Sequence, residues 1–184
     1  MFINPKTAIE QGWVTFPTLF TEETQKKCLQ VNAIDFTIDK LYTIDERSPF
    51  FISEEKKQMR TGQEIVPLFD VQRQESYWRL DPHSVYDGIS NFYVNVPEGV
   101  AAMLIVRSSF SRNGIYITSG LYDSGFKNYI GCGIHNRSGL AYISPGTRIG
   151  QLIFVKSESI GLYQGIYNNN VGQHWSENYK EQTK

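Results

Sequence analysis

The sequence predicts a mainly β protein, a barrel or sandwich of short strands that follows two short helices. Short runs of β-branched and aromatic residues recur along the chain, which is typical of strands. Gly, Pro, Asn and Ser separate these runs, as tight turns require. The 184 residues are 40% hydrophobic, and no repeat or linker divides them, so one domain over residues 1–184 is expected.

Two helices are expected before the first long strand. In "NPKTAIEQGW", Asn4 is suited to cap a helix, Pro5 to occupy its first position and Gly12 to end it. The segment "TEETQKKCLQV" predicts a second helix that is capped by Thr21.

The remaining pattern is β. The segment "AIDFTIDKLYTI" alternates apolar and polar residues and predicts the first strand. Later strands are expected in "SNFYVNV", "VAAMLIV", "GIYIT", "YIGCGI", "LAYI" and "GQLIFV". The stretch "SEEKKQMRTGQE", residues 53–64, is charged and lacks an apolar period, so it is expected to be an exposed loop.

Charge and cysteine content limit the possible partners. Eighteen basic and nineteen acidic residues leave a net charge of −1, which argues against general binding to nucleic acid or to an anionic membrane. Cys28 and Cys132 are far apart in sequence and form no zinc motif. No apolar run approaches the length of a membrane span, and the first residues do not resemble a signal peptide. A soluble, cytoplasmic protein is therefore expected.

The segment "VPEGVAAMLIVRSSFSRNGI", residues 96–115, changes from an apolar run to a polar one. Hydroxyls of Ser108 and Ser109, backbone N–H groups freed at a strand end, and the Arg112 fork together suit a phosphate or another oxyanion. The alternative is a polar turn with its arginines facing water. Walker-type and GxGxxG motifs are absent from the sequence.

Five segments in this order resemble the dCTP deaminase and dUTPase superfamily. They are "QVNAIDFTID", "RSSFSRNG", "TSGLYDSGF", "SPGTRIGQLIF" and "YQGIYNNNVG". The resemblance covers nearly the whole chain. It implies a distorted β barrel or jelly roll of the dUTPase-like type, a homotrimer with active sites shared between neighbours, a deoxynucleoside triphosphate (dUTP or dCTP) as substrate, and Mg²⁺ as cofactor.

The superfamily contains two chemistries, dCTP deamination and dUTP hydrolysis, and one residue argues against deamination. Deamination of dCTP uses a glutamate proton shuttle in "GFxGxxTLELxN", and the matching stretch "GFKNYIGCGIHN" places Gly133 at that glutamate. The zinc-dependent signature is missing as well. Asp123 and Glu158 offer no clear substitute, so no nearby carboxylate is expected to replace the glutamate.

The hydrolytic motif is better preserved. "SGLYDSGF" is similar to the dUTPase "AGVIDxxY", which implies that Asp123 orients a water and Phe126 packs on deoxyribose. The resemblance also implies that Arg112 acts with Asp123 and that Asp35 meets a metal through water. Further substrate contacts are implied for Arg107, Ser108, Ser109, Gln151 and Tyr167.

Each assignment has a structural alternative. Asp35 suits a strand-end turn, Gln151 an exposed strand position and Asp123 an Asx-turn acceptor. In the C-terminal arm, residues 163–184, Ile166 and Asn170 replace a lysine and a glutamine of the deaminase branch. Three functions therefore remain open: dUTPase-like hydrolysis to dUMP and pyrophosphate, which the retained motif favours, dCTP deamination, and a non-catalytic nucleotide-binding or trimeric relative.

Overall fold

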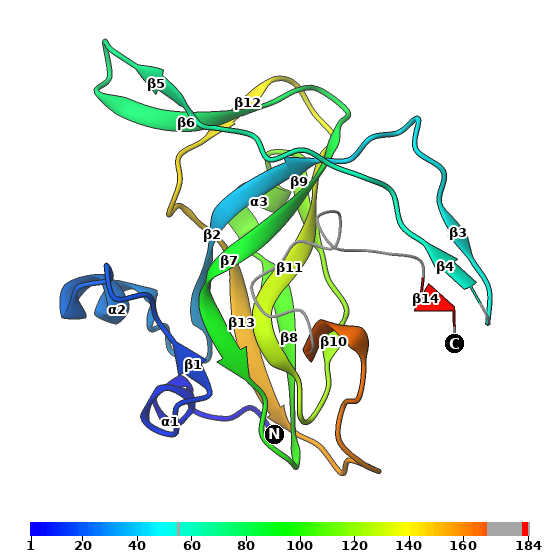
Figure 1. Ribbon diagram of the computed structural model, residues 1–184. Helices are drawn as coiled ribbons and strands as arrows, with labels where there is room; N and C mark the ends of the chain where they lie inside the picture. Colours follow the sequence, from blue (N-terminus) through cyan, green and yellow to red (C-terminus); the bar gives the residue numbers. More distant parts are fainter. Residues whose placement is uncertain (55, 169–181, 184) are drawn as a thin grey trace.

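The computed structural model describes residues 1–54, 56–168 and 182–183, and it confirms the mainly β prediction (Figure 1). The central sheet has eight strands in the order β10-β8-β13-β2-β7-β11-β9, with β1 added on β7. Its strands are β1 (Val14–Thr15), β2 (Ile34–Thr43), β7 (Val85–Asn95), β8 (Val100–Val106), β9 (Ile115–Thr118), β10 (Leu121–Tyr122), β11 (Lys127–Asn136) and β13 (Arg148–Lys156).

The central sheet is antiparallel in every pairing and curls into a half-barrel. The order of strands places β9 at one edge and β8 one strand from the other edge, yet β8 and β9 contact each other. The chain connects these two strands through α3 (Ser108–Ser111). The curl therefore joins the two ends of the sheet around one core.

Both predicted helices are present, with the expected caps. Helix α1 (Pro5–Glu10) begins after Asn4, whose side chain accepts a hydrogen bond from the N–H of Lys6. Gly12 follows the helix at φ +69°, the left-handed conformation that ends helices and favours glycine. Helix α2 (Glu22–Cys28) is capped by Thr21, which accepts from the N–H of Thr24 at 3.2 Å.

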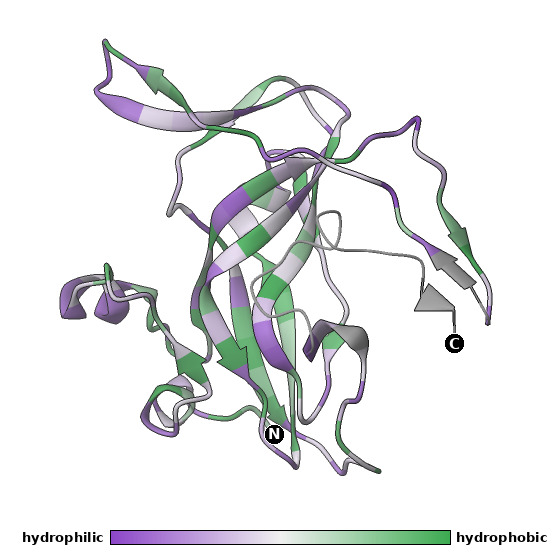
Figure 2. Ribbon diagram, in the orientation of Figure 1, coloured by the Kyte–Doolittle hydropathy of each residue, from purple (hydrophilic) through white to green (hydrophobic). Residues whose placement is uncertain are grey.

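The core lies inside the curled sheet and follows the alternation of its strands. Residues of β7 alternate between buried and half-buried positions along the whole strand, and β11 shows the same period over most of its length. The largest fully buried side chains include Trp78, Phe36, Phe92 and Phe154. Figure 2 shows this hydrophobic character concentrated along the central strands, whereas α2 is largely hydrophilic.

Two small sheets project from the half-barrel (Figure 1). One has the order β12-β6-β5, from β5 (Leu68–Asp70), β6 (Glu75–Leu80) and β12 (Ala141–Ile143). The other has the order β14-β4-β3, from β3 (Phe51–Ile52), β4 (Lys56–Gln58) and β14 (Gln182–Thr183). The expectation of a plain loop over residues 53–64 is therefore wrong at β4, because backbone pairing can form a short strand without an apolar period.

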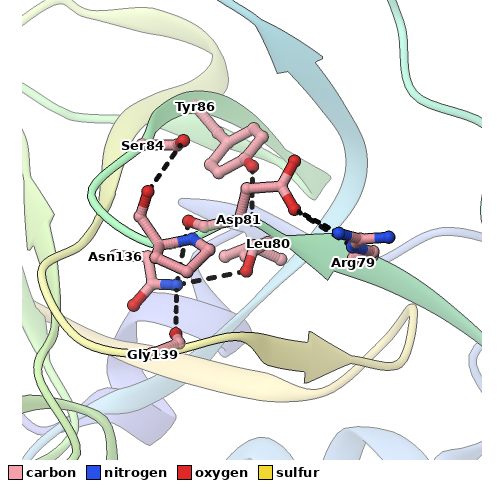
Figure 3. Close-up of polar contacts among 8 residues, drawn as sticks. Arg79, Leu80, Asp81, Ser84, Tyr86, Asn136 and Gly139 are labelled. Carbon is pink, nitrogen blue, oxygen red and sulfur yellow. Dashed lines mark hydrogen bonds and ion pairs between the residues drawn. The ribbon is translucent and has the colours of Figure 1, made fainter.

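The end of β11 is held by one buried amide, drawn in Figure 3. Asn136 is fully buried, and its Nδ2 lies 2.8 Å from the Gly139 carbonyl oxygen, 3.0 Å from that of Asp81 and 3.1 Å from that of Leu80. Its Oδ1 accepts from the N–H of Ser138. These bonds join β11 to the end of β6 and fix the strand that carries Gly133.

Within the part of the chain that the structure describes, no helix is long and apolar enough to cross a membrane.

Candidate functional site

A cleft of about 600 Å³ opens on the face formed by β7, β9, β10 and β11. This volume lies within the range of pockets that hold a small molecule. Its walls are rich in aromatic side chains, contributed by Tyr122, Phe126, Tyr129, Tyr163 and Tyr167. Met59 also lines the cleft, so the segment of residues 53–64 reaches it. The sequence alone did not connect this segment with a site.

Phe126, for which the sequence predicts a contact with the sugar, lies in this aromatic wall. A turn brings the ring there: Gly125 has φ +88°, and the N–H of Phe126 donates to the carbonyl oxygen of Asp123. The ring centroid of Phe126 is 5.1 Å from that of Tyr122 and 5.9 Å from that of Tyr163. These contacts fix the ring, which is 6% exposed and belongs to the core that backs the cleft.

Asp123 lies beside the cleft, directly after β10, and its side chain is exposed. Its neighbours Tyr122 and Phe126 both line the cleft. Burial raises the pKa of Tyr163, a backbone hydrogen bond from Tyr167 lowers it, and the charge of Asp123 raises it further. Asp123 therefore acts electrostatically on a group that lines the cleft, and it remains open to water.

The beginning of the C-terminal arm borders the cleft at η1 (Ile166–Asn168). Tyr167 lines the cleft, and its carbonyl oxygen accepts a hydrogen bond from Nδ2 of Asn128. The Asn168 amide donates to the carbonyl oxygen of Gly125 and accepts from the N–H of Lys127, both at 2.8 Å. Asn170 and the rest of the predicted arm, residues 169–181 and 184, lie outside the described residues.

Asp35 and Gln151 lie together, but in a different place from the cleft. Asp35 is 1% exposed, and its Oδ2 is 3.0 Å from Nη1 of Arg148. Gln30 donates to the same oxygen at 3.0 Å, and Gln151 lies 3.4 Å from Oδ1. The protein itself thus neutralises this carboxylate and donates hydrogen bonds to it. These contacts offset the cost of burying the charge in a strand.

These contacts do not fit a metal site built by the protein. Asp35 is paired with a guanidinium, and the described residues contain no group of three or more His, Cys, Asp or Glu side chains that could hold a metal ion. Mg²⁺ is commonly held by one or two carboxylates, waters and substrate phosphates. Binding of Mg²⁺ thus stays a proposal, in which the phosphates of a bound triphosphate supply most of the ligands.

The predicted phosphate cradle is a helical turn rather than an open strand end. In α3, the N–H groups of Phe110 and Ser111 donate to the carbonyl oxygen of Arg107, and that of Arg112 donates to Ser108. The expectation of freed N–H groups is therefore wrong at these three positions, because the turn uses them internally. The side chains of Ser108, Ser109 and Arg112 are exposed.

Arg107 has a structural contact. Its Nη1 donates to the carbonyl oxygen of Arg148 at 2.8 Å, which ties the end of β8 to the start of β13. The predicted phosphate contact of Arg107 remains a prediction beside this observed bond.

The cradle and Asp123 lie toward opposite ends of β8. Tyr122, immediately before Asp123, pairs with Ala102 near the start of β8, whereas Arg107 follows the end of β8. A strand rises roughly 3.3 Å per residue, so about 20 Å separates Asp123 from Arg107 along the strand direction. One chain therefore does not bring together these two predicted half-sites, the cradle and Asp123.

Sequence reasoning missed several polar residues of the cleft, among them Asp87 and Thr118. Asp87 on β7 pairs with Gly133, and Thr118 on β9 pairs with Gly133 from the other side. Asp87 is thus a carboxylate next to Gly133 that the sequence analysis did not weigh as a substitute for the missing glutamate. The available signal was an aspartate in the middle of the strand segment "VYDGIS", on the same face as Val85 and Ile89.

The curled half-barrel and its aromatic cleft define a mainly β protein with a cleft large enough for a small molecule. A family profile described as dCTP deaminase-like matches residues 8–157. The chain belongs to this family.

Relatives by sequence are nucleotide-processing enzymes. A probable deoxyuridine 5'-triphosphate nucleotidohydrolase of Methanopyrus kandleri is 25% identical over 153 residues, which cover 83% of this chain and 92% of the relative. A dUMP-forming dCTP deaminase of Sulfurihydrogenibium sp. is 29% identical over 182 residues, covering 94% of each chain.

Among solved structures, the 2'-deoxycytidine 5'-triphosphate deaminase from Agrobacterium tumefaciens has a TM-score of 0.60 and 13% identity. The match covers 83% of this chain and 46% of that chain, so the present chain spans about half of that structure. This likeness supports the fold.

Proposed function

We propose that the protein hydrolyses dUTP to dUMP and pyrophosphate. The observation that carries this proposal is the exposed carboxylate of Asp123 beside a cleft of nucleotide size, with Phe126 in its wall. A carboxylate there can accept a hydrogen bond from a water and direct it at the α-phosphorus, while the ring of Phe126 packs on the sugar. The named relatives fit this chemistry.

In the proposed step, the water oxygen bonds to the α-phosphorus, and the bond from that phosphorus to the bridging oxygen breaks. Pyrophosphate leaves with the electron pair, and Asp123 takes up the proton of the attacking water. The negative charge that develops on the phosphates needs cationic and hydroxyl donors. Arg112, Ser108 and Ser109 are such donors, but their half-site lies about 20 Å away along β8 at roughly 3.3 Å per residue.

This separation supports a homotrimer or another oligomer in which one copy supplies the cleft and a second copy supplies the cradle. Complementation tests it. The Asp123→Asn protein, which is expected to lack turnover, and the Arg112→Ala protein, which is expected to bind dUTP weakly, are unfolded together and refolded as a mixture. The mixture is assayed at a dUTP concentration at which neither protein alone is active. If the site is shared, random assembly restores about a quarter of the sites. Sites built within single chains would restore none.

The catalytic assignment is tested by Asp123→Asn with dUTP as substrate. The native protein is expected to release dUMP and pyrophosphate, and the variant is expected to lose turnover while still binding nucleotide, as a role in the transition state requires. Glu158→Gln is the matched control, because Glu158 is an exposed carboxylate outside the cleft. An Asp123→Asn variant as fast as the native protein would show that the assignment is wrong.

A further inference from the structure

Three residues form a row across the floor of the cleft. Asp87 on β7, Gly133 on β11 and Thr118 on β9 are direct partners in the antiparallel register, and all three line the cleft. Directly opposite residues in such strands place their side chains on the same face. Adjacent strands lie about 4.8 Å apart, so Asp87 and Thr118 stand roughly 10 Å apart with a glycine between them.

The missing side chain at Gly133 leaves room for Thr118 and His135 to approach each other over the strand. A Cβ at this position would lie 2.7 Å from Oγ1 of Thr118 and 3.2 Å from Nε2 of His135. Those two atoms are themselves 3.0 Å apart, within hydrogen-bond distance. When Nε2 of His135 carries the hydrogen, the Thr118 hydroxyl accepts a hydrogen bond from it and can still donate one of its own into the cleft.

The row thus offers an acceptor and a donor to a flat ligand. An ionised carboxylate only accepts hydrogen bonds, whereas the hydroxyl of Thr118 can donate one. Asp87 and Cys132 both line the cleft. Burial raises the pKa of Cys132, and the nearby negative charge of Asp87 raises it further.

This pattern matches the edge of cytosine. Its exocyclic amino group donates to carboxylates, and the neighbouring N3 accepts from a hydroxyl. Uracil instead presents a carbonyl oxygen at the amino position and makes no such bond with the carboxylate, so dUTP would bind in this cleft more weakly than dCTP. A carboxylate in a partly apolar cleft makes this difference stronger than it would be in water.

We propose that Asp87 recognises the exocyclic amino group of cytosine, so that dCTP is a second substrate of this cleft. The proposal rests on the hydrolytic function proposed above. The reaction is the same: water bonds to the α-phosphorus, and pyrophosphate leaves with the electron pair. The bond between C4 and the amino nitrogen stays intact, so the products are dCMP and pyrophosphate.

Binding is measured with the α,β-imido analogues of dCTP and dUTP, which keep the base preference separate from turnover. Asp87→Asn is expected to weaken the cytosine analogue at least 10-fold and to leave the uracil analogue unchanged or tighter, since an amide can donate to O4. Asp81→Asn, an exposed aspartate outside the cleft, is the control. Equal weakening of both analogues, or of neither, would overturn the proposal.

A second measurement leaves the protein unchanged. The imido analogue of the 2-pyrimidinone nucleotide, which has hydrogen in place of the amino group, is expected to bind the native protein at least 10-fold more weakly than the cytosine analogue. Equal affinities would overturn the role of Asp87 even if the Asp87→Asn protein failed to fold.

Product analysis completes the test with dCTP and the native protein. Release of dCMP and pyrophosphate without ammonia is expected. Ammonia appearing in step with dUTP or dUMP would overturn the proposal, because Asp87 would then act as a proton shuttle at C4 rather than as a recognition group. If neither nucleotide is hydrolysed but the analogues still show the preference for cytosine, the hydrolytic function fails and the role of Asp87 in recognition stands.

Discussion

Gly133→Ala is expected to destabilise the protein through one close contact. The added Cβ would meet Oγ1 of Thr118 at 2.7 Å, so the hydroxyl must move and its hydrogen bond with His135 is lost. Overpacking typically costs about 1–3 kcal/mol, and a hydrogen bond contributes about 0.5–1.5 kcal/mol. The reduced freedom of the unfolded chain returns about 0.4–1 kcal/mol. The net loss is then about 0.5–4 kcal/mol.

The matched control lies on the same strand. Among the described residues, no atom lies within 4 Å of a Cβ built on Gly131, two residues before Gly133. Gly131→Ala is therefore expected to change the free energy of unfolding by less than about 0.5 kcal/mol. Both values are measured by urea unfolding, with equal slopes as the check that the unfolded states are comparable.

A double variant identifies the atom responsible. In a Thr118→Ala background the clashing hydroxyl is gone, so Gly133→Ala is expected to cost less than it does in the native protein. The reasoning is refuted if Gly133→Ala and Gly131→Ala have the same stability, or if removing the Thr118 hydroxyl leaves the cost of Gly133→Ala unchanged.

Three further predictions concern other parts of the molecule. Arg112→Ala is expected to weaken dUTP binding about 10-fold or more and to leave deoxyuridine binding unchanged, because a charge-assisted contact to phosphate contributes about 1.5–3 kcal/mol. Calorimetry measures both affinities, and equal losses for the two ligands would show that Arg112 has a structural role. Asn136→Ala is expected to lower the free energy of unfolding in urea by about 2–4 kcal/mol, since it leaves buried carbonyl groups without their donor. Asn113→Ala, which removes an amide on the surface, should lower it by less than about 1 kcal/mol. Similar losses in the two variants would contradict the anchoring role of Asn136. Burial raises the pKa of both Cys28 and Cys132, so neither is expected to react with iodoacetamide at pH 8 until the protein is unfolded, and rapid labelling of the folded protein would refute this.

Local signals in the sequence were sufficient for the elements that local physics determines. The caps at Asn4 and Thr21 bond backbone groups within three residues, so their helices could be predicted from the sequence. The apolar run at residues 100–106 coincides with β8. The helical turn α3 could not be predicted in the same way, because Ser and Arg fit a turn, a strand end or a single helical turn equally well.

The cleft needed information that no short segment contains. Asp87 and Gly133 are 46 positions apart, and they face each other because of the register between β7 and β11, which includes a shift between Tyr129 and Gly131. One residue of slip in that register would turn Asp87 to the other face. The same limit applies to Asp35, whose main partner Arg148 comes from β13. Motifs therefore pointed to Asp123 and Phe126 as candidates, whereas Asp87 became a candidate only from the fold.

Hydrolysis of dUTP in water enriched with ¹⁸O tests the central claim most directly. Because Asp123 is proposed to direct water at the α-phosphorus, mass spectrometry should find one ¹⁸O atom in the phosphate of dUMP and none in pyrophosphate. The label should disappear with turnover in Asp123→Asn. Label in pyrophosphate, or dUTP recovered intact after incubation with the native protein and Mg²⁺, would contradict the account.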